Sequence, residues 1–130
     1  MAANLSTYME NRIIEFMRGN AITGEAAVYV GLFTADGGLE AGTLDNECSG
    51  GSYARELAGL DAAADGVTQN GANITFTTAT AAWGTVTHFA LIDAVTAGNV
   101  IMHGVLTAPR AVGDGDTAQF NATTLSITIT

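Results

Sequence analysis

The chain has 130 residues, a length typical of a single domain with one hydrophobic core. It is 48% hydrophobic but only 13% charged, about half the charged share of an ordinary soluble domain. The hydrophobic content excludes a disordered chain. The low charge predicts an apolar, uncharged surface of the kind that usually lies against other protein.

The charge balance excludes several classes of partner. Thirteen acidic residues face four basic ones, all of them arginines, and the formal net charge is -9. This charge would repel phosphate, so we expect neither nucleic acid nor a membrane as partner. No apolar run approaches the ~18 residues of a membrane span, and the first residues do not resemble a secretory signal. A lone Cys48 allows no internal disulfide and no cysteine-based zinc cluster.

The first twenty residues predict one N-terminal amphipathic α-helix. Its apolar residues recur at a spacing that gathers them on one face, namely Leu5, Met9, Ile13, Phe16 and Met17. Thr7 opens a capping-box spacing and Asn4 is a competing N-cap, so the predicted start stays open by about one turn. Gly19 and Asn20 suit a left-handed stop. Two roles stay open for this helix: a lid over a sheet face, or an arm that docks on a neighbouring subunit.

Strands and turns are predicted after the helix. Residues 26–34 are apolar at nearly every position and rich in β-branched and aromatic types, which predicts a central strand buried on both faces. Residues 35–52 form a long loop without periodicity, a kind that is usually functional or mobile. We expect this loop to contact a partner. Residues 53–60 are a weaker strand candidate.

The second half of the chain predicts further antiparallel strands. Residues 73–78 alternate, with Ile74 and Phe76 on the buried face. Residues 85–94 and 100–106 predict a hairpin that turns at Gly98-Asn99, and Pro109 is expected to end this unit. The last predicted strand buries Leu125, Ile127 and Ile129 and exposes its threonines.

Short strands at this spacing predict the fold class. We expect a mainly β protein, a small antiparallel β-sandwich that is jelly-roll-like or barrel-like, with one N-terminal amphipathic α-helix. The predicted organisation is a helix over residues 1–20 followed by a single antiparallel β domain over residues 21–130.

Few residues suggest chemistry. The Gly98-Asn99 turn would place His88 and His103 on one sheet face roughly 15 Å apart, which is too far to share a metal ion. We interpret both as structural or interface histidines. Asp114 and Asp116 have the composition of a turn, and a calcium role stays open for them.

An enzyme is the least favoured class. Ser49 and Ser52 lie in a glycine-rich loop that lacks the Gly-x-Ser-x-Gly elbow, and no glycine-rich stretch has the features of a phosphate cradle. Trp83 and Tyr53 could form a platform that stacks on a sugar, although buried aromatic anchors are commoner in so small a domain. We therefore expect no catalytic residue, no cofactor and no metal. A glycan-binding jelly-roll module is kept as a distant alternative.

Several stretches resemble a known family. They include residues 28–35 (VYVGLFTA), 49–55 (SGGSYAR) and 83–90 (WGTVTHFA), and shorter pieces within 92–129 also fit. The chain is similar to a family of small tailed-bacteriophage virion structural proteins, commonly labelled phage tail fibre protein. The resemblance implies a non-enzymatic component of the virion that is assembled in the cytoplasm of the bacterial host.

Within this class we expect a homo-oligomer on the particle surface, most simply a trimer. The chain has no heptads or repeats of an elongated shaft, which favours a capsid cement or decoration protein, with a tail fibre or tail-associated protein as the alternative. Its partners would be the major capsid protein or tail proteins. The candidate interface comprises the five apolar helix residues together with Tyr53 and Arg55, since tyrosine and arginine are favoured anchors. An internal pair between Arg55 and a carboxylate is the alternative.

Overall fold

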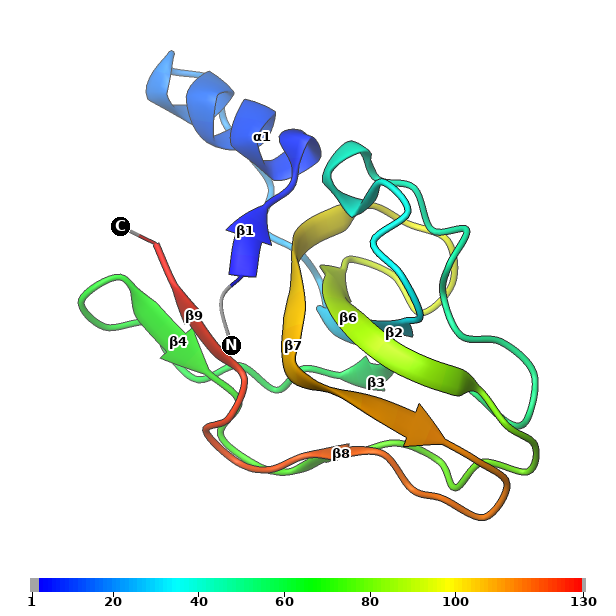
Figure 1. Ribbon diagram of the computed structural model, residues 1–130. Helices are drawn as coiled ribbons and strands as arrows, with labels where there is room; N and C mark the ends of the chain where they lie inside the picture. Colours follow the sequence, from blue (N-terminus) through cyan, green and yellow to red (C-terminus); the bar gives the residue numbers. More distant parts are fainter. Residues whose placement is uncertain (1–2, 130) are drawn as a thin grey trace.

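The structure is a computed structural model that describes residues 3–129, and it confirms a mainly β fold with antiparallel pairing and one α-helix near the N-terminus (Figure 1). The strands within these residues do not close into a barrel. The elements in chain order are β1 (Ala3–Leu5), α1 (Thr7–Met17), β2 (Tyr29–Phe33), the 3₁₀ helix η1 (Leu39–Ala41), β3 (Glu56–Leu57), β4 (Val67–Gln69), β5 (Ile74–Thr75), β6 (Gly84–Ile92), β7 (Val100–Val112), β8 (Gln119–Phe120) and β9 (Ser126–Thr128).

The main sheet has five strands in the order β1-β7-β6-β2-β3. β2 lies inside this sheet and is buried on both faces, as residues 26–34 predict. Val30 and Leu32 belong to the larger hydrophobic cluster, whereas Phe33 belongs to a second cluster with Leu39 of η1. A strand that is apolar on both sides can lie only between two packed layers.

Two short strand pairs form the rest of the β structure. β4 pairs with β9, and β5 pairs with β8. Ile74 and Phe76 are buried and Thr75 is exposed, which confirms the predicted alternation of this strand. Residues from these pairs enter the same hydrophobic cluster as residues from the main sheet, so the core lies between them.

The hairpin formed by β6 and β7 differs from its prediction. Ile92 pairs with Val100, so the connection is a seven-residue loop, 93–99, rather than a two-residue turn. Both oxygens of Asp93 accept hydrogen bonds from Asn99, one from its backbone N–H at 2.7 Å and one from its side-chain amide at 2.9 Å. This side-chain bridge closes the wider loop.

β7 continues past Pro109, which was expected to end the hairpin, and is therefore longer than predicted. The pairs Val86–Arg110 and His88–Val105 show that the register with β6 shifts at this point, and Figure 1 shows β7 bending sharply along its length. An irregular stretch of this kind tolerates proline, which cannot donate a ladder hydrogen bond.

Two smaller predictions also fail. Leu5 belongs to β1, where it pairs with Met102, and is not part of the helix. Ile129 is exposed, whereas Leu125 and Ile127 are buried as expected. Ile129 follows the end of β9, where its backbone N–H bonds to the carbonyl of Gly66.

A buried amide holds the short strand pairs together. Asn70 is fully buried; its side-chain N–H groups donate to the carbonyls of Ala72 and Asn121, each at 2.9 Å. Its side-chain oxygen accepts from the backbone N–H of Leu125 at 2.9 Å. This side chain therefore joins the segment after β4 to the segment between β8 and β9.

We expect Asn70→Ala to lower the free energy of unfolding by at least about 2 kcal/mol, because it leaves buried backbone groups without partners. Urea denaturation followed by circular dichroism measures this change. The control is Asn73→Ala, because exposed Asn73 makes one side-chain bond, to the N–H of Ala122. Equal losses in the two variants would contradict the role given to Asn70.

Candidate assembly interface

The base of helix α1 is fixed to the sheet by Ser6. This residue, rather than Thr7 or Asn4, is the N-cap: its hydroxyl oxygen accepts a hydrogen bond from the N–H of Met9 at 3.3 Å, and its O–H donates to the carbonyl of Val100. Its own N–H bonds to the carbonyl of Ile101 at 3.0 Å. Ser6 is fully buried, so the start of the helix is held at one position on β7.

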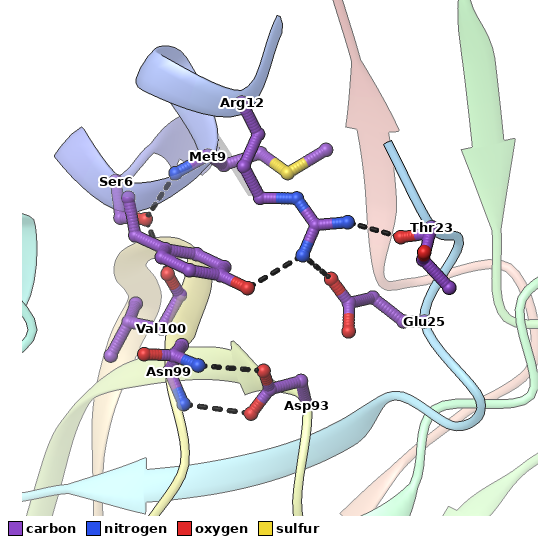
Figure 2. Close-up of polar contacts among 9 residues, drawn as sticks. Ser6, Met9, Arg12, Thr23, Glu25, Asp93, Asn99 and Val100 are labelled. Atoms are coloured by element: carbon purple, nitrogen blue, oxygen red, sulfur yellow. Dashed lines mark hydrogen bonds and ion pairs between the residues drawn. The ribbon is translucent and has the colours of Figure 1, made fainter. Parts of the chain in front are cut away.

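Polar contacts fix the orientation of the helix. Figure 2 shows Arg12 reaching away from α1 to Glu25, at 2.8 Å, and to the carbonyl of Thr23. The same guanidinium donates to the hydroxyl of Tyr8, one turn earlier, at 2.5 Å. The segment that follows the helix is thereby tied back to the helix itself.

Glu40 of η1 adds a bridge on another side of the helix. One of its carboxylate oxygens accepts from the hydroxyl of Thr7 at 3.2 Å, and the other accepts from His103 of β7 at 2.9 Å. The first turn of α1 is therefore connected to both η1 and β7.

The helix ends as the sequence predicts. Gly19 has a left-handed backbone with a φ of 95°. Its N–H bonds to the carbonyl of Phe16 at 3.1 Å, and the N–H of Asn20 bonds to the carbonyl of Glu15 at 3.0 Å. This pair of bonds defines a Schellman motif.

The predicted apolar stripe divides into two parts. Leu5 and Met9 pack against the core of the chain, and Ile13 is half-buried. Phe16 and Met17, in contrast, are 61% and 78% exposed, and Ile14, which the stripe did not include, is 53% exposed. Figure 1 shows the far end of α1 standing away from the sheet. The base of the helix is thus built into the domain, while its end offers apolar side chains to solvent.

Tyr53 and Arg55 take part in an internal network. The side chain of Arg55 is only 3% exposed and forms a two-pronged pair with Glu47, with both nitrogen–oxygen distances at 2.7 Å. Its remaining nitrogen donates to the carbonyls of Ala94 and Ala97 at 2.8 and 2.7 Å. The structure therefore shows the internal pair that was the alternative for Arg55, and every nitrogen of this guanidinium has a partner within the chain.

The electrostatics of the network follow from burial. Burial is the largest single effect and acts to lower the pKa of Arg55, but the hydrogen bonds to Glu47 and the nearby negative charges of Glu47 and Asp93 together outweigh it, and the pKa is raised. Burial also raises the pKa of the Tyr53 hydroxyl far above its usual value. The neutral hydroxyl donates to Glu47 at 2.8 Å and accepts from the N–H of Leu32 at 2.9 Å.

The histidines lie closer together than the sequence predicted. Ala90 pairs with His103 and His88 pairs with Val105, so the two histidines are diagonal neighbours on adjacent strands. Both line a small cavity of about 150 Å³ next to Asp36. The earlier separation of roughly 15 Å is wrong because it assumed the two-residue turn. Within residues 3–129 no three His, Cys, Asp or Glu side chains are placed to hold one metal ion.

The remaining candidate residues have local structural roles. Asp116 closes a turn: its carboxylate accepts from the N–H of Gly113 at 2.8 Å, and its own N–H bonds to the carbonyl of that glycine at 3.0 Å. Trp83 is buried against Tyr53 and donates its indole N–H to the carbonyl of Gly51 at 3.0 Å. It is therefore no exposed platform for a sugar. In the part of the chain that the structure describes, no helix is long and apolar enough to cross a bilayer.

Taken together, these observations define a small antiparallel β protein that carries an anchored helix with an exposed apolar end. A family model described as "Podophage GP4 fiber I protein gp80" matches residues 4–128. The chain belongs to this family of phage fibre-type structural proteins, which confirms the resemblance seen in the sequence. No curated protein matches the chain.

The buried Arg55–Glu47 pair predicts a large loss of stability when one partner is removed. We expect Glu47→Ala to lower the free energy of unfolding by about 3–5 kcal/mol, because the guanidinium would stay buried without a counter-charge. Urea denaturation measures this value. The control is Glu15→Ala, which removes the exposed pair between Glu15 and Arg18 and should cost less than about 1 kcal/mol. A similar loss in both variants would contradict the internal network.

Cys48 provides a test of burial in the same region. Burial raises the pKa of its thiol to about 11, and only the thiolate reacts with alkylating reagents. We expect iodoacetamide at about pH 8 to leave the folded chain unmodified and to label it in guanidinium chloride. Mass spectrometry measures the added mass. Rapid labelling of the folded chain would show that the loop of residues 35–52, which contains Cys48, is open in solution.

Proposed function

We propose that this chain is a non-enzymatic fibre subunit associated with the tail of a phage particle. It assembles as a homo-oligomer, most simply a trimer, through the exposed end of α1. The family match over residues 4–128 supports the fibre class. The observation that carries the assembly is the exposure of Ile14, Phe16 and Met17 on a helix whose base is fixed.

The physical need for a partner comes from the helix itself. α1 has 11 residues, a length at which an isolated helix is only marginally stable in water. Its base gains stability from Ser6 and Arg12, but its last turn gains nothing comparable from the sheet. Burying the side chains of Phe16 and Met17 would contribute about 1.5–3 kcal/mol each, so contact with identical helices both covers and stabilises this turn.

The charges beside this apolar surface permit such contact. Glu15 pairs with Arg18 at 2.5 Å, and the other oxygen of Glu15 accepts from the amide of Asn20. The end of the helix therefore carries little unbalanced charge, although the whole chain has a net charge of -9. Copies of the chain meet with the least repulsion at this point. Homo-oligomers usually have closed point-group symmetry, and a trimer held by identical helix contacts satisfies this condition.

We expect Phe16→Ser combined with Met17→Ser to convert the oligomer into a folded monomer, because neither side chain contributes to the core. Size-exclusion chromatography with light scattering measures the mass, and circular dichroism checks the fold. The control is Val95→Ser, which removes an exposed apolar residue from the 93–99 loop and not from the exposed end of α1. A monomeric parent chain at micromolar concentration, or an unchanged mass in the double variant, would overturn the assembly proposal.

The position on the particle follows from copy number. A tail-associated fibre, in contact with tail proteins, is present in far fewer copies than the major capsid protein, whereas a capsid decoration protein approaches the copy number of the shell. The family description favours the fibre. We expect quantitative mass spectrometry of purified particles to give a small fraction of the capsid-protein count. A count comparable with that of the capsid protein would instead establish the decoration role and a contact with the shell.

A further inference from the structure

A groove lies between the second half of β7 and the segment that carries β8. Its volume is about 580 Å³, within the range of ~300–1,000 Å³ that is usual for ligand sites. Figure 1 shows these two segments running beside each other on the side of β7 that faces away from β6. No residue of α1 lines the groove, so it is separate from the proposed assembly surface.

The floor of the groove is apolar and fixed in place. Leu106, Val112 and Phe120 contribute to it. The ring of Phe120 also packs against Phe76 and Phe89, with ring centres 6.4 and 6.3 Å apart. Because these two rings belong to the core, the floor cannot collapse to fill the groove without disrupting the core packing.

Arg110 on the wall has donor groups to spare. The other three arginines form ion pairs with glutamates, Arg12 with Glu25, Arg18 with Glu15 and Arg55 with Glu47. For Arg110, which lines the groove and is exposed, no carboxylate in residues 3–129 lies within ion-pair distance. Its planar guanidinium can therefore donate several hydrogen bonds to a ligand.

Asp116 and Asn121 add both kinds of hydrogen-bonding group to the same lining. Asp116 uses one carboxylate oxygen for the N–H of Gly113, which leaves the other oxygen as an acceptor. Asn121 accepts from Gln119 at 2.7 Å through its side-chain oxygen, and its amide nitrogen remains a donor. Thr117 and Thr124 also line the groove; their hydroxyl groups already bond to Thr78 and to the carbonyl of Asn121, and each oxygen keeps capacity as an acceptor.

We propose that this groove binds an uncharged oligosaccharide. Each sugar hydroxyl can accept from Arg110 or Asn121 and donate to Asp116, and the C–H face of a sugar ring suits the apolar floor. A polyanion is disfavoured because Asp116 lies in the groove and the chain has a net charge of -9. The sugar-binding site suggested by the sequence involved Trp83, which is buried. The groove is a different surface, and Trp83 does not line it.

The test uses the full chain on an array of immobilised neutral and acidic oligosaccharides. We expect binding to neutral members, with the affinity for the best of them reduced about tenfold or more in Arg110→Ala, the loss expected for hydrogen bonds from a charged group. Ala108→Phe, which places a ring in the groove from an exposed position, should abolish binding. Titration calorimetry measures each affinity.

The matched control is Asp114→Asn, in the same turn as Asp116 but outside the groove lining; it should bind as the parent chain does. Circular dichroism checks the fold of every variant and light scattering checks its oligomeric state, which separates this test from that of the assembly. The proposal would be overturned if no neutral oligosaccharide bound or if acidic oligosaccharides bound more tightly. Unchanged affinity in Arg110→Ala or Ala108→Phe would also overturn it. A change of oligomeric state in Ala108→Phe would show that a second copy of the chain occupies the groove.

Discussion

The buried guanidinium of Arg55 is the interaction on which much of the structure depends. It holds Glu47 of the long loop on one side and the carbonyls of Ala94 and Ala97 on the other. It thereby fixes the loop between β6 and β7, which Asp93 and Asn99 close from within. The next residue along the chain, Val100, offers the carbonyl that receives the hydroxyl of Ser6.

A buried ion pair therefore sets the position of a surface helix. Figure 2 shows the end of this path, where Asp93, Asn99 and Val100 lie below the first turn of α1. The desolvation cost of burying Arg55 is large, and the geometry offsets it through two carboxylate contacts and two carbonyl contacts. Because each guanidinium nitrogen of Arg55 is directed at a specific partner, these contacts hold the loop, and with it the base of α1, in one position.

Local sequence patterns predicted the parts of the fold that depend on neighbouring residues. The stop of the helix at Gly19, the buried strand around Val30 and Leu32, and the alternation at Ile74 and Phe76 each follow from propensity and burial over a few positions. The helix start was predicted only to within one turn, and the N-cap, Ser6, lies within that range. The sequence could not give the second bond of Ser6, to the carbonyl of Val100, far away in the sequence. No pattern within one turn reports such a contact.

The turn between β6 and β7 shows why register was harder to predict. Gly98-Asn99 has the composition of a two-residue turn, but the side chain of Asp93 binds the N–H of Asn99 and stabilises a longer loop. This change of register brings His88 and His103 to one cavity. The role of Arg55 depended in the same way on Glu47, whose distance from Arg55 the sequence could not give.

The distribution of charge connects these features to assembly. Three of the four arginines are paired with glutamates, so the net charge of -9 comes from carboxylates spread over the rest of the chain. At physiological salt, charges beyond about 8 Å are largely screened. Repulsion between two copies is therefore strongest where their β domains come into close contact.

The end of α1 stands away from the sheet and is nearly neutral, so identical helices can meet there while the domains stay apart. An exposed apolar turn on a rigid base satisfies both conditions, since the hydrophobic contact is strong enough to associate the chains and the acidic domains oppose any closer, less ordered packing.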